Sequence, residues 1–167
     1  MRNVFHESLS DAYGSEWYLE PNVISHLFQR RKISSALVDL AHSKRPLEAG
    51  RVVASLTFGF WTACLTAQYD ETLWRKGGLA KAFQNSGLKP SRKEVNGKLT
   101  PIRQIRNRIA HHEPILYFNL PKHHRNIVEL TEWLSPVAAD WSRAHCTFRA
   151  CYCEEFAKTM TNPKDRR

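Results

Sequence analysis

Hydrophobic periodicity is the feature that most constrains how this chain folds. In nearly every segment the apolar residues recur three or four positions apart, which places them on one face of a helix. No segment shows the apolar–polar alternation of a half-buried strand. With 167 residues, 42% of them hydrophobic, the chain is long enough to bury one sizeable core. The sequence therefore predicts an all-α helical bundle built from one domain.

The regular segments give the expected order of helices. We divide the chain into a polar lead-in at 1–22, a helical domain at 23–160 and a frayed polar tail at 161–167. The 52–67 segment is apolar on nearly all sides, so we expect one helix there, in the centre of the bundle. The other predicted helices lie at 23–41, 68–84 with a break at Gly77-Gly78, 91–112, 121–133 and 136–156.

The basic helix at 91–112 contains a proline, which removes a backbone donor and crowds the preceding turn. Pro101 either kinks one long helix or begins a new helix with Thr100 as its N-cap. Pro114 should end the helix soon after two adjacent histidines. We interpret His123-His124-Arg125 as a solvated helix start. The tryptophans expected to pack in the core are Trp61, Trp74, Trp133 and Trp141.

The charge of the chain points to an anionic partner. The formal net charge is +9, and the window from Lys89 to His111 carries +6 of it, from seven basic residues and the acid Glu94. Nucleic acid is the commonest partner of such a basic patch. The first 20 residues are polar and mixed in charge, and the run from Val52 to Ala67 is too short to span a bilayer comfortably. We therefore expect a cytoplasmic protein that does not enter a membrane.

The four cysteines do not indicate a metal site. Cys64 lies in the apolar run and is interpreted as a small core residue. The other three could form a zinc site with a nearby histidine, but their spacing fits no standard pattern. We prefer reduced thiols in a cytosolic protein, and we predict no metal and no cofactor. The residues of this alternative are Cys146, Cys151, Cys153 and His145.

The stretch IRQIRNRIAHHEP, at 102–114, combines basic residues with two histidines. On a helix, Asn107 and His111 share a face, and Arg103 lies one turn before Asn107. Arg106 is about 140° round the axis from His111, so the two would not converge on one small substrate within a single ideal helix. A bend, or a second copy of the helix, would bring them together. The opposing stripe is apolar and consists of Ile102, Ile105 and Ile109.

These residue types suit cleavage of RNA without a metal. The reaction needs a base for the ribose 2′-OH and an acid for the departing 5′ oxygen, and histidine serves both roles. Arginine stabilises the negative charge that develops on the phosphate, and asparagine can orient an imidazole. The alternative is an ordinary basic helix terminus, where the helix dipole favours histidine.

Three segments of the chain resemble segments of one protein family. They are YGSEWYL at 13–19, SLTFGFWTACLTAQYDETLW at 55–74 and IRNRIAHHEPIL at 105–116, and the last contains an R-N-x-x-x-H motif. Over about residues 10–120 the chain resembles the Abi-like (abortive infection) branch of bacterial HEPN proteins. The chain departs from this family in two ways. Abi-like proteins are often considerably longer, and the proline just before the motif is unexpected.

The resemblance implies a HEPN-like helical bundle that forms a homodimer through the R-N-x-x-x-H helix, with one composite ribonuclease site. It implies a metal-independent endoribonuclease that acts as a toxin in phage defence, cuts an RNA substrate and is restrained in some relatives by an RNA or protein antitoxin. By position, Arg106 and His111 are the catalytic pair and Asn107 orients the histidine. We assign auxiliary roles to His112 and Glu113. The expected RNA contacts are Arg103, Arg108, Lys98, Arg92 and Lys93.

Two other functions remain open at this point. The same basic helix could belong to an RNA-binding module without catalysis, or the chain could be a helical adaptor in a defence or toxin–antitoxin complex. Binding needs only charge, whereas catalysis needs both an arginine clamp and a histidine, so the motif favours an enzyme.

Overall fold

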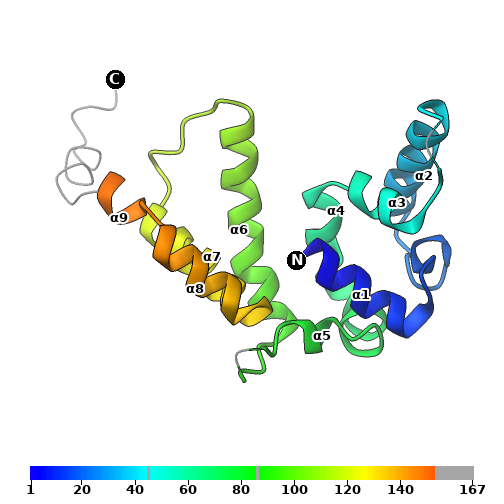
Figure 1. Ribbon diagram of the computed structural model, residues 1–167, viewed down its shortest axis with the longest axis horizontal. Coiled ribbons are helices and arrows are strands. Elements are labelled where there is room, and N and C mark those ends of the chain that lie inside the picture. The colour runs from blue at the N-terminus through cyan, green and yellow to red at the C-terminus, as the bar shows by residue number, and fades with distance from the viewer. Residues whose placement is uncertain (45, 86, 153–167) are drawn as a thin grey trace.

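The computed structural model describes residues 1–44, 46–85 and 87–152, and these residues form helices and turns with no strand (Figure 1). The prediction of an all-α protein is therefore confirmed for this part of the chain. The elements are α1 (Arg2–Tyr13), the 3-10 turn η1 (Trp17–Leu19), α2 (Leu27–His42), α3 (Ala49–Ser55), α4 (Phe58–Ala63), the 3-10 turn η2 (Ala67–Tyr69), the π-helical η3 (Asp70–Lys76), α5 (Leu79–Ala82), α6 (Arg92–Ala110), α7 (Leu120–Leu134), α8 (Pro136–His145) and α9 (Phe148–Cys151).

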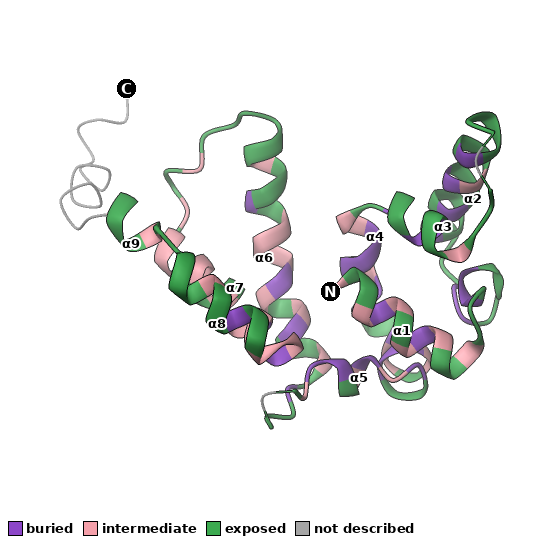
Figure 2. Ribbon diagram, in the orientation of Figure 1, coloured by how far each residue is buried: buried purple, intermediate pink, exposed green. Residues whose placement is uncertain are grey.

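The helices form two groups that meet at α6. In Figure 1, α1 to α5 lie together on one side, and α6, α7 and α8 lie together on the other. α6 packs against α7 and also against α4, and α7 packs against α8. Burial falls along α6 toward its C-terminal end (Figure 2): Val95 is fully buried, whereas Ile109 is 54% exposed. The C-terminal half of α6 therefore presents residues to solvent.

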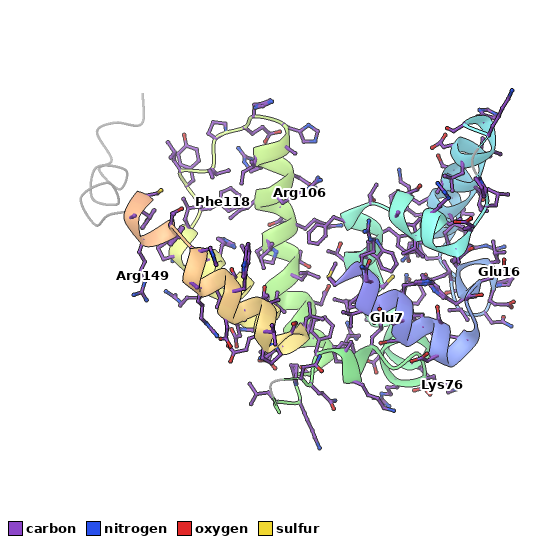
Figure 3. All side chains as sticks on the ribbon, viewed as in Figure 1. Glu7, Glu16, Lys76, Arg106, Phe118 and Arg149 are labelled. Carbon is purple, nitrogen blue, oxygen red and sulfur yellow. The ribbon has the colours of Figure 1, made fainter. Side chains whose placement is uncertain are left out.

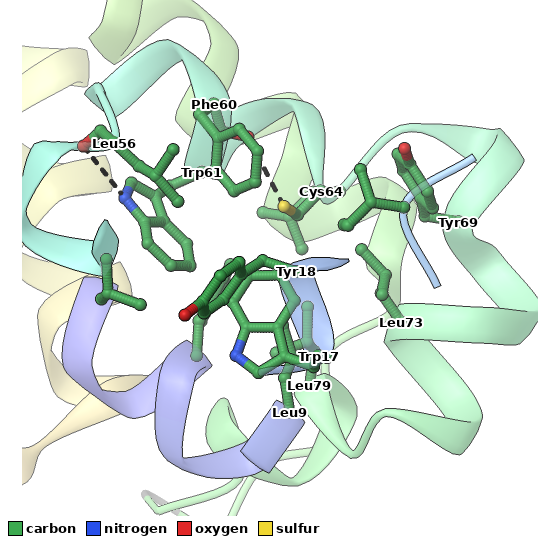
Figure 4. Packing of buried hydrophobic residues seen from close by; sticks show 14 of the residues in the cluster. Leu9, Trp17, Tyr18, Leu56, Phe60, Trp61, Cys64, Tyr69, Leu73 and Leu79 are labelled. Atoms are coloured by element: carbon green, nitrogen blue, oxygen red, sulfur yellow. Dashed lines mark hydrogen bonds between the residues drawn. The ribbon is translucent and has the colours of Figure 1, made fainter. Parts of the chain in front are cut away.

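The first residues are part of the core, so the prediction of a polar lead-in at 1–22 does not describe their structure. They fold into α1 and η1, and Phe5, Leu9 and Trp17 are all 0% exposed. The Trp17 indole N–H donates to His6 Nδ1 at 3.0 Å. Trp17 also packs edge-on against Tyr18 and Trp61 in the cluster of Figure 4. Polar residues outnumber apolar ones in this segment, which hid a narrow apolar face with a four-residue spacing.

The apolar segment at 52–67 is not one helix. α3 ends at Ser55 and α4 begins at Phe58, with Leu56 in an extended conformation between them. Thr57 accepts a hydrogen bond from the Phe60 N–H at 3.4 Å and so acts as the N-cap of α4. The break stays inside the core because the Trp61 indole N–H donates to the Leu56 carbonyl at 3.3 Å (Figure 4). Because the run is apolar at most positions, its spacing gives no sign of this break.

α6 is one helix that contains its proline. It begins at Arg92, where Ser91 accepts from the Glu94 N–H at 3.2 Å, and Pro101 lies in its interior. The suggestion that Thr100 caps a new helix is therefore wrong. α6 ends at Ala110, before the two histidines rather than after them.

The C-terminal third differs from its prediction in two respects. The segment predicted as a helix at 136–156 is divided, because α8 ends at His145 and Cys146 is extended. The described residues end at 152. The rest of the helix predicted to 156, Cys153 and the tail at 161–167 therefore lie outside the described part of the chain. The expected core position of Trp141 is wrong because its side chain is 67% exposed, whereas the other three tryptophans of that prediction are at most 7% exposed.

Two glycines provide a matched pair for testing the packing. A Cβ at Gly77 would lie 2.7 Å from both the Leu73 carbonyl and Leu9 Cδ2, whereas a Cβ at Gly97 would meet nothing within 4 Å. We expect Gly77→Ala to lower the free energy of unfolding by about 1–3 kcal/mol through overpacking. Gly97→Ala should raise it by about 0.5–1 kcal/mol, because alanine is the better helix former. Urea denaturation followed by circular dichroism measures both, and equal effects of the two changes would contradict this packing.

Candidate RNA-cleaving site

The residues of the R-N-x-x-x-H motif gather at the C-terminal end of α6. Arg106 and Asn107 lie on the exposed part of the helix, and His111 and His112 are exposed immediately after it. Figure 3 labels Arg106 on α6 and Phe118 on the loop that returns to α7. One solvent-facing region therefore contains the side chains of Arg106, Asn107, His111 and His112.

The Arg106 guanidinium is available to an anion. Its Nη1 donates to Asn107 Oδ1 at 3.3 Å, and within the described part of the chain it forms no ion pair. Asn107 was predicted to orient His111, but in this structure its oxygen accepts from Arg106 instead. The geometry therefore gives Asn107 a role in orienting the arginine.

A tight turn follows the helix and positions the two histidines. The His111 N–H donates to the carbonyls of Asn107 and Arg108, so His111 is the C-cap residue of α6. His112 has a φ of 55°, in the left-handed region that residues with a side chain rarely adopt. The Glu113 N–H donates to the Arg108 carbonyl at 2.8 Å and closes the turn. This turn directs the chain away from the helix axis before Pro114.

Arg108 and Glu113 hold the loop that follows α6. Arg108 Nε donates to the Pro114 carbonyl at 2.9 Å, and its Nη1 lies 3.4 Å from Glu113 Oε2. The guanidinium also lies over the Phe118 ring, 5.7 Å from the centroid. The structure therefore assigns both residues a structural contribution, in addition to their predicted RNA-binding and auxiliary roles.

Two of the predicted RNA contacts are paired inside the fold. Arg92 Nε lies 2.8 Å from Asp70 Oδ1 and its Nη1 donates to the Leu65 carbonyl at 2.7 Å. Lys98 Nζ lies 2.8 Å from Glu129 Oε2 and joins α6 to α7. Of the remaining predicted contacts, Lys93 is exposed and Arg103 is half-buried. Arg103 Nη1 would lie 4.0 Å from a Cβ placed on Gly59, so this side chain reaches α4.

Arg92 and Lys93 are adjacent but should respond differently to alanine. Arg92→Ala should lower the free energy of unfolding by about 1–3 kcal/mol, because the Leu65 carbonyl loses its Arg92 donor and Asp70 keeps only its ion pair with Arg75. Lys93→Ala should leave stability unchanged within about 0.5 kcal/mol, since the side chain is exposed. Thermal unfolding of the two variants at the same salt concentration measures the difference. A destabilisation by Lys93→Ala as large as that by Arg92→Ala would contradict the assignment.

A small apolar pocket lies beside the arginine, on the face where α6 meets α7. Its volume is about 170 Å³. Two of its lining residues are unusually open for their type: Ile109 is 54% exposed and Ile127 is 46% exposed. An apolar face of this kind is suited to contact another protein surface. The residues that line the pocket are Ile102, Ile105, Arg106, Ile109, His123 and Ile127.

His123 is a site residue that the sequence argument missed. It was interpreted as part of a solvated helix start, but it is half-buried and lines the same pocket as Arg106. Its Nδ1 is buried without a hydrogen-bond partner among the described residues, and the Phe118 ring meets it edge-on at 5.9 Å. Burial, and then the nearby Lys122 charge, lower the pKa of His123 below its ordinary value. The available signal was its spacing of four residues from Ile127, which places both residues on the same face of a helix.

Comparison of the chain with protein-family models, with curated proteins and with solved structures found no match. In the part of the chain that the structure describes, no helix has both the length and the apolar character needed to cross a membrane. The described residues also include no group of three or more His, Cys, Asp or Glu side chains arranged to hold a metal ion.

Proposed function

We propose that this protein is a metal-independent endoribonuclease of the HEPN type, with Arg106, Asn107 and His111 as its site. The observation that carries the proposal is the exposed Arg106 guanidinium, which is oriented by Asn107 and paired with no described carboxylate. Such a group is suited to bind a phosphate diester. His111 lies at the end of the same helix, where an imidazole can exchange protons with RNA.

The reaction follows from these side chains. His111 takes the proton of a ribose 2′-OH, or donates a proton to the departing 5′ oxygen, because imidazoles in general titrate near neutral pH. Arg106 binds the phosphate oxygens and stabilises the charge that they gain in the transition state. His112, the next residue in the turn, would contribute the second proton-transfer group. The products would be a 2′,3′-cyclic phosphate and a 5′-hydroxyl.

The proposal includes a homodimer. Arg106 and His111 are five positions apart, which separates them by about 140° around a helix axis, so a second copy is the simplest source of a facing partner. The exposed apolar residues Ile109 and Ile127 lie beside Arg106 and supply a surface for that contact. A two-fold arrangement would bring the histidine of one copy near the arginine of the other.

The biological role in this proposal is growth arrest through RNA cleavage in the cytoplasm, as a toxin in phage defence. Three basic residues of α6 form no ion pair with any described residue and would guide RNA to the site: Lys93, Arg103 and Arg106. An RNA or protein antitoxin would restrain the activity by covering the same exposed helix end.

Incubation of the purified protein with total RNA and with tRNA, in buffer that contains EDTA, tests the proposal. We expect discrete fragments that end in 2′,3′-cyclic phosphates, because attack by the 2′-OH requires no metal. RNA binding that weakens steeply with salt, without any cleavage, would instead support the non-catalytic RNA-binding module. A lack of RNA affinity at moderate salt would leave the helical adaptor as the remaining function.

A further inference from the structure

A second pocket lies on the other side of α7, apart from the RNA-cleaving site. It has a volume of about 850 Å³ and lies between α7 and the segment that runs from the end of α8 into α9. Among the residues that line it are His124 from α7, Cys146 from the end of α8 and Phe148 from α9. The extended backbone at Cys146 ends α8 and brings the following residues back toward α7. Residues 22 positions apart in the sequence therefore share one cavity.

A thiol and an imidazole are in contact in this pocket. His124 Nε2 lies 3.1 Å from Cys146 Sγ. The His124 ring is stacked on Phe148, with 4.3 Å between the centroids and 6° between the planes, so the ring orientation is fixed. In the tautomer that carries its hydrogen on Nδ1, His124 Nε2 accepts the thiol proton. A thiol beside a base in this way is an activated nucleophile.

The other described cysteines lack this arrangement. Cys64 is fully buried, and burial raises the pKa of its thiol to about 12, so it is not expected to react. Cys151 is exposed, but no described side chain forms a hydrogen bond with it. Among the described residues there is therefore one buried thiol and one exposed thiol with no described base beside it, and both serve as internal references for Cys146.

The pocket also has a positive character. Its two carboxylates are already paired: Glu129 with Lys98 at 2.8 Å, and Glu132 with Arg143. The two arginines of the lining that form no ion pair within the described part of the chain are Arg125 and Arg149. Guanidinium groups without a partner attract carboxylates, so an anionic reagent should enter this pocket more readily than a cationic one.

We propose that Cys146 is a reactive thiol that exchanges with small anionic disulfides of the glutathione type. The Sγ proton passes to His124 Nε2, and the thiolate attacks one sulfur of glutathione disulfide. The Cys146–glutathione S–S bond forms as the original S–S bond breaks. Cys146 is oxidised, the departing glutathione is reduced, and its thiolate takes up the proton from the His124 imidazolium. This modification site is independent of the proposed RNA chemistry.

The first test compares thiols within one protein. A full-length Cys153→Ser variant, in which Cys151 is the single thiol of its proteolytic peptide, is incubated with glutathione disulfide at neutral pH. Peptide mass spectrometry then gives the rate at each cysteine. We expect Cys146 to react about tenfold faster than Cys151, because the His124 imidazole can take the proton of Cys146 and no described side chain does so for Cys151. Equal rates at the two sites would overturn the proposal.

The second test isolates the role of His124. In His124→Gln, the rate at Cys146 should fall about tenfold at neutral pH and approach the original rate well above the ordinary thiol pKa of about 8.5. The rate at Cys151 should not change. A rate that stays low at high pH would show that the histidine only maintains structure, and an unchanged neutral rate would also contradict the proposal. The other charged or titratable groups of the pocket remain the same in both proteins; they are Arg125, Glu129, Glu132, Arg143, Arg149 and Tyr152.

The third test examines the charge of the reagent. Cystamine is a cationic disulfide, so the ratio of the glutathione disulfide rate to the cystamine rate at Cys146 reports the electrostatic contribution. This ratio should exceed the ratio at Cys151, and it should fall to the Cys151 value when Arg125 and Arg149 are both replaced by alanine. Equal ratios at the two thiols before that change would rule out selection of anionic disulfides.

Discussion

Replacement of His111 by alanine is expected to lower RNA cleavage by about 100-fold to 10,000-fold, the usual contribution of a general acid or base. The imidazole is exposed at the C-cap of α6, and alanine removes the proton-transfer group without removing a core contact. Arg106→Ala should cause a loss of about 100-fold or more, because the developing phosphate charge loses its guanidinium. Cleavage of one labelled RNA under single-turnover conditions in EDTA measures both losses.

A matched control separates catalysis from general charge. Arg30 is an exposed arginine on α2, so Arg30→Ala removes the same charge far from the motif. It should weaken RNA binding slightly and leave the cleavage rate at saturating protein within about twofold, as for an exposed surface residue. Equal losses in Arg30→Ala and Arg106→Ala would argue that only the net charge matters. Full activity of folded His111→Ala would contradict the catalytic assignment.

Replacement of Phe5 by alanine is expected to lower the free energy of unfolding by about 3–5 kcal/mol, the cost of removing a buried phenyl ring. The Phe5 side chain is 0% exposed and meets Trp61 and Phe83 edge-on, at centroid distances of 6.2 and 5.7 Å. The change tests whether α1 belongs to the same cooperative unit as α4. Urea unfolding followed by tryptophan fluorescence gives the free energy.

The matched control lies on the same helix. Glu7 is exposed, so Glu7→Ala should change the free energy of unfolding by less than about 0.5 kcal/mol. If Phe5→Ala had an effect as small as Glu7→Ala, then α1 would be a separate and dispensable lead-in. We expect a single unfolding transition in the unmodified protein, and in Phe5→Ala a single transition at a lower urea concentration.

The fold class could be predicted because most helices show their apolar face as a regular spacing. The exceptions have physical reasons. In α1 the face is narrow and the other positions are polar, so Phe5 and Leu9 did not stand out. At Leu56 and Thr57 the chain breaks between two short helices inside a mostly apolar run, so the apolar pattern does not reveal the break. Thr57 is the one local signal there, because threonine is a common N-cap.

The residues that belong to the site could be predicted from the sequence, but most of their contacts could not. The motif spacing brings Arg106, Asn107 and His111 to one end of α6, since neighbours along a helix are set by local geometry. The pairing of Arg92 with Asp70 and the approach of His124 to Cys146 depend on packing between distant segments. No local pattern encodes such contacts, so the sequence could not separate paired from unpaired basic residues.

The central claim is that Arg106 and His111 act together from two copies of the chain, and mixing two inactive variants tests it most directly. Arg106→Ala and His111→Ala are each purified, unfolded, mixed in equal amounts and refolded, so that protomers exchange. If the site is shared, half of the dimers retain one arginine and one histidine in facing copies. Each of these dimers keeps one of the two arginine–histidine pairs of the unmodified dimer, so cleavage should recover to about a quarter of the unmodified activity after random assortment. A mixture that forms dimers but stays as inactive as either variant alone would contradict the claim.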